Sequence, residues 1–138
     1  MDQIVEFITN NWMLAAAWTV LFSMLMMSFA TSASNVIGNQ QITTMMNREN
    51  ATILDIRSKA DFDKGHLLGA INIPAAQLKD AEKKLEKFNQ SPIILVDANG
   101  LHASAAAQQL KKMDLQQISR MQGGIASWTN DNLPLNKQ

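Results

Sequence analysis

The stretch of residues 93–103 limits the fold of this chain more than any other. It opens with four apolar residues, Ile93 to Val96, which is typical of a strand buried in a parallel sheet. A short loop with Asn99 and Gly100 follows, and the Ala-rich start of a helix comes directly after it. A strand, a tight loop and a helix N-terminus together gather backbone N–H groups, which favours a negative charge there. The sequence supplies such a charge itself, because the first loop residue is Asp97.

The chain has no cysteine among its 138 residues. This excludes disulfides, thiolate metal sites and thiol catalysis together. The two histidines, His66 and His102, are too few for a histidine-only metal site, and we expect neither a metal nor a cofactor. From Arg48 onward the chain carries 12 basic and 10 acidic residues, a net charge of +2 (12 − 10), which is too little to indicate nucleic-acid binding.

An uncharged apolar run occupies residues 12–30, with only Thr19, Ser23 and Ser28 as polar members. As a helix it would be about 28 Å long, close to the hydrocarbon thickness of a bilayer. Trp12 at its start suits the membrane interface. We therefore predict one transmembrane helix over residues 12–30, preceded by a short extracytoplasmic N-terminus over residues 1–11.

Small residues at 30–33 leave open the alternative that this run is a cleaved signal peptide. Signal peptides begin with basic residues, whereas this chain begins with Asp2 and Glu6, so an uncleaved anchor is favoured. All Lys and Arg residues lie at or after Arg48. The positive-inside rule then places the rest of the chain in the cytoplasm.

Small residues recur every four positions in the apolar run, at Ala15, Thr19 and Ser23. On one helix face they would permit close approach of a second copy, and so a homo-oligomer. The favoured alternative is that the hydroxyl groups bond to carbonyls of their own helix. Residues 31–40 are small and polar and predict a flexible tether with a reach on the order of 20 Å.

From residue 41 the pattern alternates between short strands and helices. Strands are predicted at 52–55, 70–73, 93–96 and 117–121, and helices at 43–47, 78–88, 103–112 and around Trp128. This alternation predicts an α/β domain with a parallel sheet flanked by helices. Ligand sites in such sheets lie at the carboxyl ends of the strands, so Asp55, Asp97 and the Gly123-Gly124 turn should share one rim.

Three separated motifs point to a known family. They are Asp-Ile-Arg at 55–57 with Asp-Phe at 61–62, Gly-His-Leu-Leu-Gly-Ala-Ile-Asn-Ile-Pro at 65–74, and Gly-Gly-Ile-Ala-Ser-Trp at 123–128 with Leu-Pro at 133–134. Together they resemble the signatures of rhodanese-like domains over residues 41–135, which leaves 136–138 as a tail. A membrane anchor followed by one such domain resembles the membrane-anchored rhodanese-like proteins of bacterial inner membranes.

The resemblance also assigns a role to the loop after the central strand. In active members a Cys there carries a sulfane sulfur as a persulfide, which loop amides and often an Arg stabilise. The family pattern of Cys, two residues, Gly, one residue, Arg, Ser keeps Gly100 but has Asp97, His102 and Ala103 in place of the other three. The degenerate loop comprises Asp97, Ala98, Asn99, Gly100, Leu101, His102 and Ala103.

Sulfur transfer needs a thiolate, and a carboxylate oxygen cannot hold sulfane sulfur. The sequence therefore predicts a catalytically inactive sulfurtransferase. We favour Asp97 as a structural acceptor of loop N–H bonds over Asp97 as a nucleophile. Asp55 and Arg57 are interpreted as an ion pair that supports the rim, with Arg57 as a ligand clamp the lesser alternative. His66 is interpreted as a structural histidine.

Two functions remain open at this point. The first is an adaptor at the cytoplasmic face of the inner membrane that binds a membrane protein, for example in membrane-protein insertion or secretion, although no residue names such a partner. The second is an enzyme or sensor that uses the loop of Asp97 and His102 on a small ligand, without sulfur transfer.

Overall fold

The computed structural model describes residues 1–31, 34–115 and 117–137 of the chain. It divides into two compact units, Met1–Ala33 and Ser34–Gln138.

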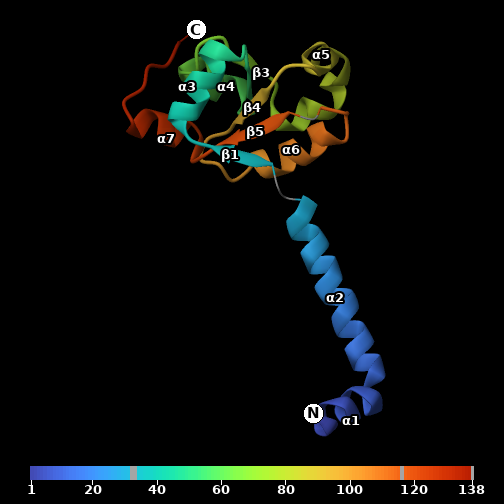
Figure 1. Cartoon of the computed structure of the whole chain (residues 1–138). Helices are drawn as coiled ribbons and strands as arrows, with labels where there is room; N and C mark the ends of the chain where they lie inside the picture. The colour runs from blue at the N-terminus through green and yellow to red at the C-terminus, as the bar shows by residue number, and fades with distance from the viewer. Residues whose placement is uncertain (32–33, 116, 138) are drawn as a thin grey trace. The chain divides into compact units, whose positions relative to one another are not determined.

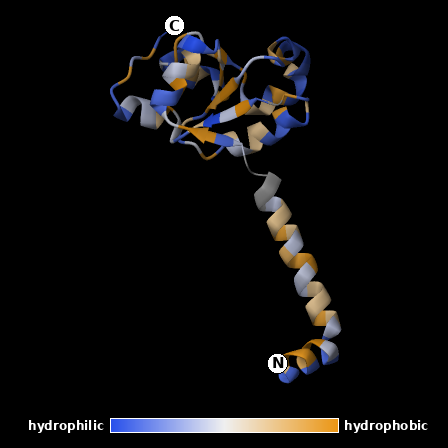
Figure 2. Cartoon of the chain, in the orientation of Figure 1, coloured by the Kyte–Doolittle hydropathy of each residue, from blue (hydrophilic) through white to orange (hydrophobic). Residues whose placement is uncertain are grey.

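The N-terminal unit consists of two helices, α1 (Asp2–Asn10) and α2 (Trp12–Thr31) (Figure 1). The axes of Asp2–Asn10 and Trp12–Ser28 meet at 89°. Figure 2 shows α2 in orange and tan with pale turns between them and none of the deep blue of α1, which mixes hydrophilic and hydrophobic residues. Within the described residues, neither helix alone has both the length and the apolar character to cross a membrane, and only the bent pair taken together meets both criteria. The spanning helix expected over residues 12–30 therefore stays a prediction.

The C-terminal unit is built on a five-stranded parallel sheet in the order β1-β5-β4-β2-β3. Its strands are β1 (Asn35–Ile37), β2 (Thr52–Asp55), β3 (Ile71–Asn72), β4 (Ile93–Val96) and β5 (Ile118–Met121). The predicted α/β class with a parallel sheet flanked by helices is confirmed. The predicted bounds of β2 and β4 match the structure, and those of the strands at 70–73 and 117–121 are longer by one or two residues than β3 and β5.

Helices cover both faces of the sheet (Figure 1). They are α3 (Asn39–Arg48), α4 (Lys59–Lys64), α5 (Glu82–Leu85), α6 (Ala103–Lys111) and α7 (Gly124–Asn130), with 3₁₀ turns η1 (Ala75–Ala81) and η2 (Glu86–Phe88). The single helix expected over 78–88 is thus three short pieces. Buried Leu78 and Ala81 are spaced by three residues, and the 3₁₀ helix is the form that places such positions on one face.

Two buried clusters make up the core, one on each face of the sheet. Along β4, Ile93 and Leu95 belong to the cluster under α6, while Ile94 and Val96 belong to the cluster that includes Trp128 of α7. All four β4 side chains are at most 1% exposed. This alternation explains why a central parallel strand reads as an unbroken apolar run in the sequence.

The expected tether over residues 31–40 needs correction. Residues 35–37 form β1, which pairs with Ser119 to Met121 of β5, and α3 already begins at Asn39. Ile37 is buried in the core, and this burial stabilises β1. The strand is too short to show an alternating pattern in the sequence. The folded domain therefore starts near Ser34 rather than at residue 41. At the other end Asn136, expected in the tail, pairs with the backbone of His66.

Candidate functional site

The candidate site lies where β2 and β4 end at their carboxyl termini. The two strands leave the sheet together, because the backbone N–H of Ile56 still donates to the Val96 carbonyl at 2.9 Å. Beyond them lies a pocket of about 250 Å³. Its lining residues are Ile56, Arg57, Ser58, Asp61, Ala75, Asp97, Ala98 and His102.

Asp97 is the first residue after β4, and its carboxylate is enclosed by the loop that follows. Its Oδ1 accepts the backbone N–H of Gly100 at 2.7 Å. Its Oδ2 accepts those of His102 at 2.8 Å and Ala103 at 3.1 Å. Only 2% of the residue is exposed. These three N–H groups therefore point at a charge that belongs to the chain, which is what the structural interpretation of Asp97 requires.

The turn at the start of α7 packs directly against this loop. The N–H groups of Ile125 and Ala126 donate to the carbonyls of Asp97 and Ala98, at 2.9 and 3.0 Å. A Cβ at Gly124 would lie 2.5 Å from the Asp97 carbonyl oxygen, and the residue has φ = +60°. Only glycine fits at position 124. The Gly-Gly turn at 123–124 therefore lets α7 pack directly against the loop backbone and hold it in place.

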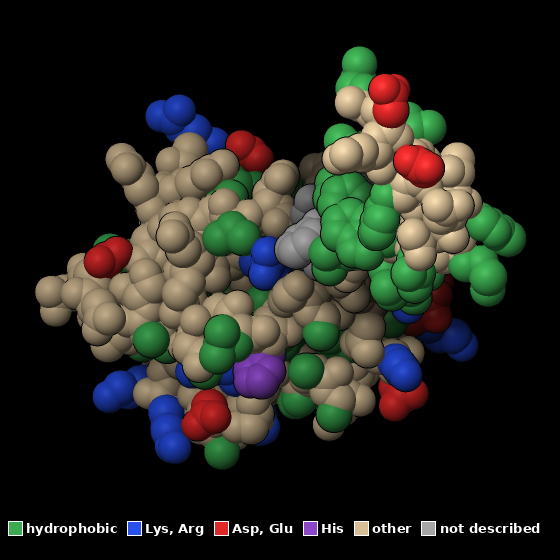
Figure 3. All heavy atoms as spheres, turned by 90° about the horizontal axis from the view of Figure 1, so that it is seen from below, with side chains coloured by type: hydrophobic (Ala, Val, Ile, Leu, Met, Phe, Trp, Pro, Cys, Tyr) green, Lys and Arg blue, Asp and Glu red, His purple; other side chains and the backbone are tan. Residues whose placement is uncertain are grey.

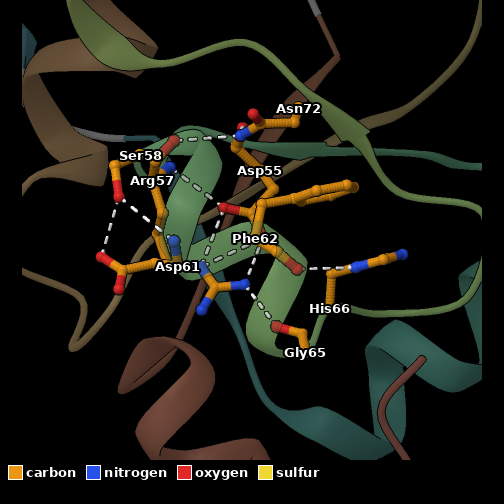
Figure 4. A network of polar contacts seen from close by, with 8 residues as sticks. All are labelled: Asp55, Arg57, Ser58, Asp61, Phe62, Gly65, His66 and Asn72. Atoms are coloured by element: carbon orange, nitrogen blue, oxygen red, sulfur yellow. Dashed lines mark hydrogen bonds and ion pairs between the residues drawn. The ribbon is translucent and has the colours of Figure 1, made fainter. Parts of the chain in front are cut away.

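A buried ion pair lies at the end of β2, beside the pocket that Arg57 helps to line (Figure 4). The Arg57 Nε donates to both carboxylate oxygens of Asp55, at 3.0 and 3.1 Å, and Nη2 donates to Oδ2 at 2.7 Å. Asp55 is fully buried and the Arg57 side chain is 10% exposed. The charge of Arg57 is therefore largely neutralised within the rim, although the residue also lines the pocket.

Two further contacts hold this pair in place, and neither was anticipated. Arg57 Nη2 also donates to the carbonyl of Gly65 at 2.7 Å. The Asn72 side-chain amide donates to the carbonyls of Asp55 and Arg57, at 3.2 and 3.0 Å (Figure 4). Asn72 lies in β3, next to β2 in the sheet, and the sequence signal that could have found it is its place within the motif at 65–74.

Ser58 and Asp61 add polar groups to the pocket that sequence reasoning missed as site residues. The Ser58 hydroxyl caps α4, since it accepts the Asp61 N–H at 3.3 Å and donates to Asp61 Oδ2 at 3.0 Å. The hydrogen bond from Ser58, followed by that from Lys64, holds the pKa of Asp61 below its ordinary value. The Ser-x-x-Asp spacing at 58–61 resembles a capping box, with Asp in place of Glu, and could have revealed the cap.

The two histidines have different environments. His66 is buried, its ring stacks on Phe62 with the ring centres 3.8 Å apart, and its Nδ1 lies 2.8 Å from the Phe62 carbonyl. This geometry, which Figure 4 shows, makes His66 a structural residue, and it does not belong to the lining of the pocket. His102 is exposed and lines the pocket at the N-cap of α6.

The structure brings together only part of the predicted loop set. Asp97, Ala98 and His102 line the pocket, whereas Leu101 is 75% exposed and Ala103 lies fully in the core. The Asn99 side chain accepts the Leu101 N–H at 3.2 Å, which shapes the loop tip. Among the residues that the structure describes, no group of three or more His, Asp or Glu side chains is placed to hold a metal ion.

Comparison with known protein families gives one clear match. Residues 39–131 match the model of the rhodanese-like domain. This range begins at α3 and ends just after α7, so it contains β2 to β5, the pocket and the degenerate loop.

Similar proteins include both uncharacterised and named relatives. The chain is 34% identical to the uncharacterised protein YibN of Escherichia coli K12, over 98% of this chain and 97% of that protein. It is 28% identical to the thiosulfate sulfurtransferase GlpE of Pseudoalteromonas translucida, over 64% of this chain and 82% of that enzyme. The crystal structure of a rhodanese-related protein from Thermoplasma volcanium superposes with a TM-score of 0.68 at 26% identity, over 75% of this chain and 99% of that one.

Proposed function

Since this chain belongs to the family of rhodanese-like domains, we propose that it is a member without sulfurtransferase activity that works by binding another protein. The observation that carries the proposal is the buried carboxylate of Asp97, which accepts all three of its hydrogen bonds from the loop backbone. In the family pattern this is the position of the sulfur-carrying Cys. The loop is therefore closed around an anion of its own.

The chemistry of the loop supports loss of sulfur transfer. A sulfurtransferase must form and cleave a bond between two sulfur atoms, and the chain contains no cysteine to provide one of them. Asp97 is also a poor nucleophile here, because both oxygens are hydrogen-bonded and the residue is almost fully buried. The pocket that remains beside Asp97 presents Arg57, Ser58 and His102 as a surface for contact rather than a reaction centre.

We further propose that the N-terminal helices anchor the domain to the bacterial inner membrane, with the domain on the cytoplasmic side. The support is the apolar character of α2 and the distribution of basic residues, all of which lie at or after Arg48. The similarity to YibN covers 98% of the chain and so includes these helices. Anchoring would raise the effective concentration of the domain for a weak contact with a membrane protein. Membrane-protein insertion or secretion machinery is one class of such partners.

A second candidate function uses the pocket for a small ligand. It is favoured by the position of His102, which is exposed and lines the pocket together with Arg57 and Ser58. The carboxylates of Asp61 and Asp97 line the same pocket, which disfavours anionic ligands. We therefore rank this function below protein binding.

Loss of sulfur transfer is tested with a thiosulfate–cyanide assay on the full-length protein. We expect no turnover from the wild-type chain and no gain in mass by a sulfur atom after exposure to thiosulfate. The Asp97→Cys variant is the matched comparison, because it restores the thiol in the same loop. Turnover by the wild-type chain would contradict the proposal outright.

The adaptor role is tested by crosslinking in native membranes. The full chain is compared with a chain that lacks residues 1–30, expressed at the same level. We expect specific crosslinks to a membrane protein from the full chain and their loss from the shortened chain. Equal crosslinks from both chains would show that the anchor is not needed, and the absence of specific crosslinks from the full chain would rule out the adaptor.

A further inference from the structure

Helix α1 has two chemically different sides. Ile4, Val5, Phe7 and Ile8 are between 49% and 67% exposed and, at helical spacing, fall on one side. The other side carries Asp2, Gln3, Glu6, Thr9 and Asn10. Figure 3 shows the hydrophobic side chains gathered over the N-terminal helices. An exposed apolar surface of this kind marks a contact surface, and α1 has no buried residue of its own.

The bend between α1 and α2 lies at Asn11, the one residue between the two helices. Its backbone N–H and its side-chain amide both donate to the Phe7 carbonyl at 3.0 Å, which closes α1. Its carbonyl accepts the N–H groups of Leu14 and Ala15, which opens α2. These hydrogen bonds end α1 and begin α2 on the two sides of the junction, where the helix axes meet at 89°.

Helix α2 differs from α1 because it has no polar side. The hydroxyl of Thr19 donates to the Ala16 carbonyl at 2.9 Å, and that of Ser23 to the Val20 carbonyl at 2.8 Å. These bonds satisfy the hydroxyl groups within the helix, as the favoured alternative to helix pairing through Ala15, Thr19 and Ser23 requires. A surface of this kind suits hydrocarbon, whereas the polar side of α1 does not.

We propose that α1 lies in the headgroup interface of the membrane, with its apolar side toward the acyl chains, while α2 enters the bilayer. This inference rests on the proposed membrane anchor. If α2 runs along the membrane normal, the bend of 89° places α1 in the plane of the membrane. Trp12, exposed at the start of α2, then lies at the interface, where Trp is enriched. A helix with one apolar and one polar side is the type that binds in this plane.

The charges of α1 determine whether its binding should depend on anionic lipids. Its polar side carries Asp2 and Glu6 and neither Lys nor Arg. Binding must therefore come from apolar burial, and it should not depend on anionic lipids.

The chain without cysteine is an ideal background for testing this arrangement. Single cysteines are introduced in turn at residues 3–10 and spin-labelled in the full chain, reconstituted in phosphatidylcholine nanodiscs. Collision with oxygen and with a water-soluble nickel chelate then reports the surroundings of each label. We expect labels at Ile4, Val5 and Ile8 to contact lipid and labels at Gln3 and Glu6 to contact water, with a helical period between them. Labels at Leu21 and Met24 of α2 serve as controls and should contact lipid.

The outcomes separate the two proposals. Water contact at every α1 position, with lipid contact in α2, would overturn the interfacial helix and leave the anchor intact. Water contact in α2 would overturn the anchor itself. An α1 pattern that appears only with several copies in one nanodisc would show that α1 pairs with a second copy, which contradicts the inference. An equal pattern with and without added phosphatidylglycerol is expected, and a pattern that needs the anionic lipid would contradict it as well.

Discussion

Asp97 organises the loop between β4 and α6 from its centre. Its two oxygens accept three backbone N–H groups within 3.1 Å, and two of these N–H groups belong to the start of α6. The sequence predicted that a carboxylate would lie among backbone donors, because a strand, a tight loop and a helix start follow one another. It could not predict which N–H groups are used, since that depends on the left-handed backbone of Gly100, with φ = +90°.

The first prediction concerns this carboxylate. Asp97→Ala removes the acceptor of three N–H groups in an almost fully buried site, so we expect a loss of about 2–4 kcal/mol in the free energy of unfolding. Chemical denaturation of the full chain measures the effect. Asn99→Ala is the matched control, because it removes one acceptor from the exposed loop tip and should cost less than about 0.5 kcal/mol. An equal effect of both substitutions would show that Asp97 does not organise the loop.

The contacts around Asp55 and Arg57 were predictable only in part from the sequence. Asp55 and Arg57 were expected to pair because opposite charges two residues apart follow a buried strand, and they do pair. The hydrogen bonds that Gly65 and Asn72 make with this pair were not expected, since they join residues up to 17 positions apart. The Asn72 contacts follow from the pairing of β2 with β3, and the Gly65 contact follows from the path of the chain at the end of α4. The pattern of one strand contains neither.

At the scale of elements, the degenerate loop depends on α7. The Gly123-Gly124 turn lies against the loop backbone, and a side chain at Gly124 would meet the Asp97 carbonyl, the Asn99 N–H and the Ala98 carbonyl carbon within 2.7 Å. Nineteen residues (104–122) separate the loop of residues 97–103 from the turn at 123–124 in the sequence, but the two form one unit in the fold.

The second prediction tests that unit. Gly124→Ala adds a collision with backbone atoms to the strain of a positive φ, so we expect a loss of about 3 kcal/mol or more in stability. Gly69→Ala is the control, because Gly69 has φ = +73° but open space around its Cβ, and it should cost about 1 kcal/mol. Thermal unfolding compares the two variants. Equal losses would mean that the close approach of α7 to the loop does not matter.

Elements were predictable where their own residues carry the signal. The strands at 52–55 and 93–96 were predicted with the observed bounds, because their apolar residues are buried on both faces of the sheet. The segment 75–88 was not, because it is divided into two 3₁₀ turns and one short α-helix, a division that its pattern of charged and apolar residues does not show. β1 was missed because three residues are too few to show the alternation of a strand. It forms because its backbone pairs with β5, a contact that its own sequence does not indicate.

At the scale of the whole molecule, the sequence predicted an N-terminal apolar segment and a separate folded domain, and the chain does divide into two units. The boundary was placed too late, at residue 41. Small polar residues indicate a tether only when nothing downstream binds them, and here Asn39 donates to the Asp131 carboxylate at 2.6 Å and to the Ser127 hydroxyl at 3.3 Å. Composition alone cannot reveal such a contact across the domain.

The third prediction concerns this boundary. A fragment of residues 34–138 should fold cooperatively, because it keeps β1 and all of α3. A fragment of residues 41–138 loses buried Ile37, the edge strand beside β5 and the contacts of Asn39. Burial of one such side chain contributes about 1.5–3 kcal/mol, so the shorter fragment should be less stable by at least that amount. Urea unfolding of both fragments measures the difference. Equal midpoints of unfolding would show that the folded domain begins at residue 41.

The carboxylate inside the degenerate loop has a consequence for oxidising conditions. A thiolate in the same cradle would pass through sulfenic to sulfinic acid, and its size and hydrogen bonds would change at each step. The carboxylate of Asp97 has no such chemistry, and the chain has no cysteine elsewhere that could form a mixed disulfide. The shape of this pocket is therefore indifferent to peroxide and to the thiol–disulfide balance of its surroundings. A partner that recognises the loop would meet the same loop surface in a reduced and in an oxidised cell.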